Sequence, residues 1–188
     1  MPAFHISRRR SLQTAVATLL NCAALNGTAK QPAPAAASDE NSDQQLVPAV
    51  KTALQKAITF MSDTVAVRGG YVYEVSLDLK KRRGEGTATP TEIWVQPPGT
   101  PAVGEALLDA FTATQNPQHL QAALNAADAL LFGQLESGGW ADRVDFDPAG
   151  KNTGRYRHGR GKAKGRNYST LDDDKSQSAI RFLIRLDQ

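Results

Sequence analysis

The chain has 188 residues, a formal net charge of +3 and a single cysteine. This length suits one modest domain, and one cysteine cannot form an internal disulfide framework or a cysteine zinc site. The three histidines are scattered along the chain, so a histidine zinc cluster is also improbable.

The first 29 residues have the order of an export signal. A basic run containing Arg8, Arg9 and Arg10 precedes a weakly apolar stretch over residues 14–25, and small residues follow at 27–29. The paired arginines favour the twin-arginine variant. The apolar stretch is shorter than the roughly 18 residues of a membrane span, so we expect cleavage near Ala29 and no transmembrane segment. Lipidation at Cys22 is the weaker alternative, because Asn21 stands where a lipoprotein signal has a small residue.

Residues 30–45 are rich in Pro, Ala, Ser, Asp, Asn and Gln without apolar periodicity, which predicts a disordered linker. Removal of residues 1–29 takes away three arginines and no acid, so the mature chain has a charge near zero. Net charge therefore does not indicate a partner.

Residues 46–188 contain an internal repeat. A helical apolar pattern over residues 47 to about 66 is followed by Gly69-Gly70-Tyr71 and an extended run over 71–77. The same order recurs 69 residues later, where a helical pattern leads into Gly138-Gly139-Trp140 and a second extended run over 143–146. The glycines can adopt the positive φ that ends a helix, and the aromatic residue supplies an anchor.

Between these turns the sequence predicts a charged loop over 80–90, a short apolar run over 91–96, and then two helices. The first helix begins at Thr100, which we expect to be its cap, with Pro101 in the first turn. Asn116-Pro117 separates it from a second helix, whose inner face we assign to Leu120, Ala123, Leu124, Ala127, Leu131 and Leu135. His119 is expected to be exposed. A last helix begins near Asp172 with Ala179, Ile180, Leu183 and Ile184 inside.

This order predicts an all-α fold: an incomplete (α/α) toroid or a helical-hairpin repeat, with short β-like segments after the GG-aromatic turns. One complete unit and two halves are present, whereas about three units are normally needed for a stable core. We therefore expect the sequence to be the front part of a longer repeat protein, truncated at its carboxyl end.

Residues 134–188 resemble the opening repeat of family 10 pectate lyases. The resemblance rests on Gly138-Gly139-Trp140 followed by the segment 169–183, in which Asp172 matches the aspartate of a T-x-D-N-x-A-T motif and an Ile-Arg-Phe-Leu core follows. Asp173, Lys175 and Ser176 stand where that motif has Asn, Ala and Thr. The resemblance implies a toroid that cleaves polygalacturonate by β-elimination, with calcium bound near Asp172 and Asp173. The arginine base and a second aspartate motif of that family belong to later repeats, so no catalytic residue is assigned and this chain alone need not be active.

The residues themselves offer four candidate features. Three consecutive acids, Asp172 to Asp174, provide the oxygen ligands that calcium prefers, although helix capping explains the same pattern. A cationic loop over 151–166 has seven basic residues and no acid, and its Arg155, Arg157 and Arg160 are assigned to an acidic polysaccharide. The alternative is that this is a solvated surface loop without a ligand. Nucleic acid is disfavoured as a partner because no nucleic-acid-binding motif is present. Trp140 is a candidate for sugar stacking, with core packing as the alternative. Asp142, Asp145 and Asp147 alternate and can line one face.

The sequence thus predicts an exported, pectate-lyase-like repeat protein that acts on acidic polysaccharide. The alternative is a non-catalytic carbohydrate-binding or interaction module. A terpene-cyclase-like toroid shares the GGW turn, but 6% aromatic residues are too few for a hydrophobic carbocation pocket.

Overall fold

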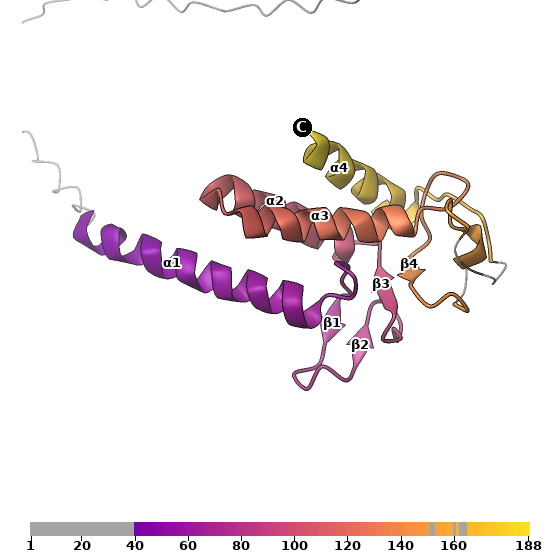
Figure 1. Cartoon of the computed structure of the whole chain (residues 1–188), viewed down its shortest axis with the longest axis horizontal. Helices are drawn as coiled ribbons and strands as arrows, with labels where there is room; N and C mark the ends of the chain where they lie inside the picture. Colours follow the sequence, from indigo (N-terminus) through magenta and orange to yellow (C-terminus); the bar gives the residue numbers. More distant parts are fainter. Residues whose placement is uncertain (1–39, 151–152, 160, 162–164) are drawn as a thin grey trace, which may run out of the picture. The chain divides into compact units, whose positions relative to one another are not determined.

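The computed structural model describes residues 40–150, 153–159, 161 and 165–188, with side chains described from residue 46 onward. The predicted export signal, Cys22 and most of the predicted linker lie outside these residues. The described chain is mostly helical (Figure 1), and its α-helices are α1 (Glu40–Phe60), α2 (Thr100–Thr114), α3 (Pro117–Phe132) and α4 (Lys175–Asp187). The all-α prediction with short β segments is confirmed in this part of the chain.

Short strands connect the helices. Two antiparallel pairs are formed, β1 (Glu74–Val75) with β2 (Arg82–Arg83), and β3 (Glu92–Trp94) with β4 (Arg143–Asp145). Three short helical segments complete the fold: the π-helical turn η1 (Met61–Val65) and the 3₁₀ turns η2 (Thr153–Arg155) and η3 (Asp172–Asp174). The extended run predicted over 71–77 is reduced to β1, and the predicted loop 80–90 contains β2.

The first helix begins earlier than predicted. Residues 40–45, which composition assigned to the linker, are the first turns of α1. Toward its other end, α1 continues directly into η1. The predicted helix over 47–66 is therefore confirmed as the combination of α1 and η1.

The two halves of the repeat have the same order and a shared hydrogen bond. Module 1 runs from α1 through Gly69-Gly70-Tyr71 to α2, and module 2 runs from α3 through Gly138-Gly139-Trp140 to α4. Gly69 and Gly138 both adopt positive φ, at 83° and 95°. The amide of Tyr71 donates to Thr100 Oγ1 over 2.9 Å, and the amide of Trp140 donates to Ser176 Oγ over 3.4 Å. In each module, a hydroxyl near the start of the second helix thus holds the aromatic turn.

Thr100 is not the cap that we expected. Gly99 occupies the cap position without a side-chain hydrogen bond, while Thr100 is the first residue of α2 and Pro101 lies in the first turn, as predicted. The Thr100 hydroxyl is fully buried, and it also donates to the carbonyl of Tyr71 over 3.2 Å. Its role is to connect α2 to the aromatic turn of module 1.

The core lies where α2, α3 and α4 pack together. In α3 most of the buried residues are alanines, and the full buried set is His119, Ala122, Ala123, Ala126, Ala127, Ala129 and Leu130. The predicted inner residues Leu124 and Leu131 point outward, with 39% and 44% of their surface exposed. Alanines allow neighbouring helices to approach closely, which explains why they face the core instead of the leucines. In α4, Ala179 is buried as predicted and Leu183 is partly buried, but Ile180 and Ile184 are exposed.

His119 is buried, contrary to the prediction. Only 1% of its surface is exposed. Its Nδ1 lies 2.8 Å from Thr114 Oγ1 and its Nε2 lies 3.0 Å from Gln55 Oε1, so the ring connects the α2–α3 turn to α1. Both ring nitrogens therefore have partners, which makes burial of this polar side chain possible.

Within the described residues, no helix combines the length and the apolar character needed to cross a bilayer.

Candidate functional site

The acidic turn precedes α4, as predicted, but its carboxylates are partly occupied by neighbouring cations. Asp173 pairs with Lys175 at 3.1 Å, and Asp174 accepts from Arg181 at 2.9 Å. The hydrogen bond from Arg181 holds the pKa of Asp174 below its usual range. Asp173 and Asp174 both adopt positive φ, at 52° and 57°. Asp174 stands at the cap position of α4 without a capping hydrogen bond, so helix capping does not account for the cluster.

The described structure leaves calcium binding at the acidic turn untested. Calcium takes about 6–8 oxygen ligands. No group of three or more His, Cys, Asp or Glu side chains in the described part of the chain is arranged to hold a metal ion. Asp172 and Asp173 are exposed, and Asp173 is paired with a cation. Calcium at Asp172 and Asp173 therefore stays a prediction, and nothing below depends on it.

Asp173 lies close to a polar cluster of module 1 around Tyr73 and Trp94. The pKa of Tyr73 is raised to about 12, first by burial and then by the charges of Glu85, Asp173 and Asp142. The Trp94 side chain lowers the pKa of Tyr73. The Tyr73 hydroxyl and Trp94 Nε1 do not reach hydrogen-bond geometry, and neither atom has a partner among the described residues. Three carboxylates thus lie near enough to Tyr73 to affect its pKa.

The cationic loop is only partly described, since Arg160 lies outside the described residues. Arg155 donates to the carbonyl of Gly165 over 3.2 Å and pairs with Glu136 at 3.6 Å. Arg157 donates to Gln134 Oε1 over 3.1 Å. These contacts tie the loop to the region before the GGW turn. The acidic turn pairs with Lys175 and Arg181.

Trp140 packs in the core and cannot stack on a sugar. Only 1% of its surface is exposed, and its Nε1 donates to the carbonyl of Leu130 over 2.8 Å. The assignment of Trp140 to substrate binding is therefore wrong. Core packing, the alternative reading, is confirmed.

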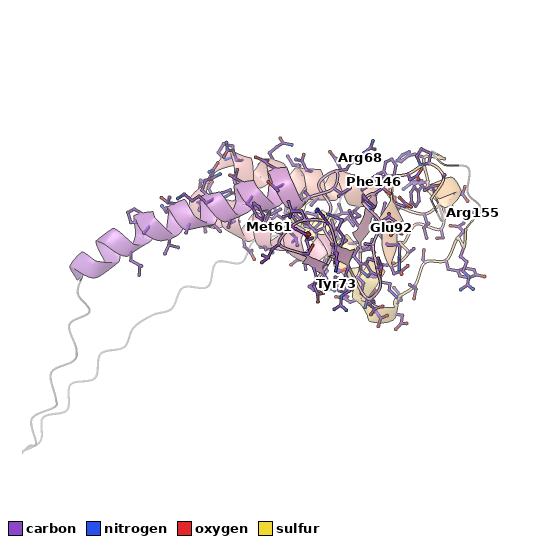
Figure 2. The ribbon with its side chains drawn as sticks, turned by 90° about the horizontal axis from the view of Figure 1, so that it is seen from below. Met61, Arg68, Tyr73, Glu92, Phe146 and Arg155 are labelled. Atoms are coloured by element: carbon purple, nitrogen blue, oxygen red, sulfur yellow. The ribbon has the colours of Figure 1, made fainter. Side chains whose placement is uncertain are left out.

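The sequence did not indicate the groove that surrounds Arg68. The Arg68 guanidinium carbon lies 5.4 Å from the ring centre of Phe146 and 5.9 Å from that of Phe132. These two rings are themselves 4.9 Å apart. Figure 2 shows Arg68 beside Phe146. None of the ion pairs between described residues involves Arg68. The structure therefore offers an exposed cation on an aromatic support.

Two hollows adjoin Arg68 and share the rings of Phe132 and Phe146. The larger, of about 340 Å³, is also lined by Asp128, Ala129, Leu131 and His158. The second, of about 260 Å³, is lined by Asp145, Asp147, Pro148, Thr153 and Tyr156. We call the two together the Arg68 groove. Asp145 and Asp147 thus lie on one face, as their alternation predicted, whereas Asp142 pairs with Arg143.

The wall beneath the groove is well supported. Asp145 is 8% exposed and accepts from the hydroxyl of Thr91 over 2.7 Å. The Tyr156 hydroxyl accepts from the amide of Asp145 over 2.8 Å. Burial raises the pKa of Tyr156 to about 12, so its hydroxyl stays protonated at neutral pH. These bonds fix the β4 side of the groove, where Phe146 follows Asp145.

Arg68 itself has an unusual backbone. Its φ is 49°, a left-handed conformation that non-glycine residues seldom adopt. Such residues are enriched at functional sites, where the surrounding structure holds them in place. The sequence signal that could have revealed the site is modest: an arginine directly before the first GG turn, and phenylalanines on either side of the second.

No protein-family model, no curated protein and no solved structure matches this chain.

Proposed function

We propose that this chain is an exported, pectate-lyase-like α/α repeat protein that binds an acidic polysaccharide in the Arg68 groove. The observation that carries the proposal is the guanidinium of Arg68, which rests on two phenyl rings beside a hollow and has no carboxylate partner among the described residues. The incomplete (α/α) toroid is part of the same proposal and is supported by the order of helices and GG-aromatic turns.

The groove has the chemistry that a uronate residue requires. A guanidinium presents paired N–H donors that match a carboxylate, and these charge-assisted bonds are stronger than neutral ones. Phe132 and Phe146 offer apolar surface to the C–H face of a sugar ring. Asp128 and Asp147 offer acceptors to sugar hydroxyls at the two ends of the groove. His158 adds an imidazole ring to the larger hollow, which brings part of the predicted cationic loop into the site.

The Arg68 groove is assigned to binding. In the family that the chain resembles, an arginine removes the C5 proton of the sugar. Arg68 lies in the first module and has no counterpart in the matched motif, so we assign it to carboxylate binding and not to proton abstraction. The non-catalytic alternative stated from the sequence is thus the function that the geometry supports best.

The test is calorimetric titration of the full chain with polygalacturonate oligomers, with methyl-esterified oligomers as the neutral control. Arg68→Gln is compared with Arg83→Gln, which removes the same charge from an exposed pair with Glu74 in the β1–β2 hairpin. An exposed charged hydrogen bond is worth about 1.4 kcal/mol, so Arg68→Gln should weaken binding about tenfold. Arg83→Gln should leave the affinity unchanged.

Three results would overturn the proposal: no binding of the acidic oligomer, equal affinity for the esterified oligomer, or equal loss in both variants. The same samples, incubated with calcium and followed by the absorbance of unsaturated products, test for lyase activity. Product formation would overturn the assignment of this chain to binding alone.

A further inference from the structure

A second hollow, of about 220 Å³, lies between α1 and η1 on one side and α3 on the other. Among the described residues it shares no wall with the Arg68 groove. Its wall combines carboxamides, hydroxyls, one carboxylate and two apolar side chains: Gln55, Ile58, Thr59, Ser62, Asp63, Gln118, Gln121, Ala122 and Asn125. We call it the amide hollow. The helices α1 and α3, which form its two sides, run in the same direction (Figure 1).

The sequence places the polar groups of the amide hollow on one face of each helix. In α3, Gln118, Gln121 and Asn125 follow at intervals of three and four residues, and in α1 Gln55 and Thr59 are four residues apart. Side chains at these spacings lie above one another on a helix surface. Gln55 Nε2 donates to Gln118 Oε1 over 2.8 Å and so joins the two faces.

The α3 face leaves hydrogen-bonding groups free for a ligand. Gln121 Nε2 donates to Asn125 Oδ1 over 3.0 Å, which orients both amides. Within the described residues, Gln118 Nε2, Gln121 Oε1 and Asn125 Nδ2 have no hydrogen-bond partner. Two donor groups and one acceptor are therefore available along one side of the hollow.

Ser62 adds a buried hydroxyl to the opposite side. Its Oγ is shielded from solvent and has no hydrogen-bond partner among the described residues. Burial raises the pKa of Tyr71 and the Ser62 hydroxyl lowers it in part, but the two hydroxyls do not reach hydrogen-bond geometry. Buried polar atoms in proteins almost always have a partner, so an unpartnered one in the wall of a hollow indicates a polar ligand. Ser62 also lies in the π-helical turn η1, a rare conformation that is frequent at functional sites.

The composition of the wall matches a neutral sugar. Sugar hydroxyls both donate and accept, as the carboxamides and the Ser62 hydroxyl do. Ile58 and Ala122 offer apolar surface to the C–H face of a sugar ring. Among the described residues of the wall only Asp63 is charged, and its carboxylate accepts from hydroxyls but repels a uronate. The volume is below the roughly 300–1,000 Å³ of sites for drug-sized ligands, which suits a single ring.

We propose that the amide hollow binds one neutral sugar residue. The amides of Gln118, Gln121 and Asn125 hold its hydroxyls from α3, and the Ser62 hydroxyl holds it from η1. The site does not depend on the Arg68 groove, whose ligand is acidic and whose anchor is a cation.

The test is an NMR titration of the ¹⁵N-labelled full chain with methyl α-glucoside, methyl α-galactoside and methyl α-mannoside. At least one of them should shift the side-chain amide signals of Gln118, Gln121 and Asn125 in a saturable manner. Methyl α-galacturonide should bind more weakly at these signals, because Asp63 is anionic. Glycerol at the same concentration of hydroxyl groups is the control for a general solvent effect and should shift none of them.

Two variants separate binding from a structural role. Asn125→Ala and Ser62→Ala each remove one neutral hydrogen-bonding group, so each should weaken sugar binding about two- to tenfold. Ser62→Ala also removes a buried atom without a partner, so its melting temperature should stay the same or rise while binding weakens. The matched control is Thr112→Ala, which removes an exposed hydroxyl that donates to the carbonyl of Leu108 in its own helix. It should leave the affinity unchanged, and so should Arg68→Gln.

The proposal would be overturned if none of the three glycosides gave a saturable shift, if glycerol gave an equal one, or if the galacturonide bound more tightly. Equal affinity in Asn125→Ala, Ser62→Ala and Thr112→Ala would have the same consequence. A lower melting temperature of Ser62→Ala would assign its hydroxyl to the framework of η1. Loss of sugar binding in Arg68→Gln would place the sugar in the Arg68 groove, and either result would also overturn the proposal.

Discussion

The packing of module 1 against module 2 depends on Gly104, and replacing this glycine by alanine tests that packing directly. A methyl group added at Gly104 would lie 2.4 Å from Phe182 Cζ and 2.6 and 2.8 Å from the two Cε atoms. Phe182 is fully buried, so its ring cannot move aside into solvent. Carbon atoms pack best at about 3.5–4.0 Å, and the ring or helix must therefore shift by about 1 Å.

Two terms of opposite sign determine the result. Overpacking of this kind costs about 1–3 kcal/mol, whereas alanine in a helix interior is favoured over glycine by about 1 kcal/mol. We expect Gly104→Ala to lower the free energy of unfolding by about 1 kcal/mol. In a Phe182→Leu background the ring edge is absent, and the same change should raise that free energy by about 1 kcal/mol.

Urea unfolding of the four proteins in this double-mutant cycle gives the coupling between the two positions, which should be about 2 kcal/mol. Gly86→Ala is the matched control, because a methyl group there meets only Arg143 Nη2 at an ordinary 3.8 Å. Equal effects of Gly104→Ala in both backgrounds, within about 0.5 kcal/mol, would refute direct contact between α2 and α4 at this point.

Three further predictions concern buried and paired groups. Trp140→Phe removes the donor to the carbonyl of Leu130 and should lower the free energy of unfolding by about 1–3 kcal/mol in urea; an unchanged midpoint would contradict the core role of this indole. Burial raises the pKa of Tyr156 from 10.0 to about 12, so the folded state holds this proton longer than the unfolded state; its contribution to stability is complete below pH 10 and is lost as pH rises through 12. Tyr156→Phe should flatten the decline in melting temperature over that range, and an equally steep decline in the variant would assign it to other groups. The hydrogen bond from Arg181 lowers the pKa of Asp174, so Arg181→Gln should raise this pKa toward its usual range in an NMR titration, with Asp78, whose pKa is lowered by Ser76, as the unchanged reference.

Local backbone chemistry made much of the fold predictable. Pro101 and the pair Asn116-Pro117 mark the ends of α2 and the start of α3 because proline limits its own φ and that of the residue before it. The GG-aromatic turns were recognisable for a similar reason, since a positive φ favours glycine. These signals act over a few residues and do not depend on the rest of the molecule.

The inner face of α3 was predicted in part, because hydrophobicity alone does not determine which apolar residues face the core. Ala123, Ala127 and Leu135 are buried as predicted, whereas Leu124 and Leu131 are exposed. The buried face is taken mostly by alanines, together with His119 and Leu130. The exposed leucines and the buried His119 follow from neighbours that are distant in sequence, such as Gln55 of α1.

The candidate site was still less predictable, because its residues come from separate segments. Arg68 follows η1, Phe132 ends α3, Phe146 follows β4 and His158 follows η2, and only the folded chain brings them together. By contrast, the acidic turn was conspicuous in the sequence, yet its charges are largely satisfied by Lys175 and Arg181. Clusters of one charge along a sequence indicate a ligand only if the fold leaves them without local partners.

The strained backbone of Arg68 allows the binding role of this residue to be separated from any structural role. A left-handed conformation costs a non-glycine residue about 1–2 kcal/mol, and glycine adopts it without this cost. The side chain recovers only about 0.5–1 kcal/mol from its position over the rings at this exposed site. Arg68→Gly should therefore leave the free energy of unfolding unchanged or raise it by up to about 1 kcal/mol, while removing the affinity for acidic oligomers that depends on the guanidinium. The reference is Arg83→Gly in β2, where φ is ordinary and glycine should destabilise by about 0.5–1 kcal/mol without affecting binding. If urea unfolding showed Arg68→Gly to be the less stable of the two, Arg68 would be part of the framework of the turn, and its conformation would need no functional explanation.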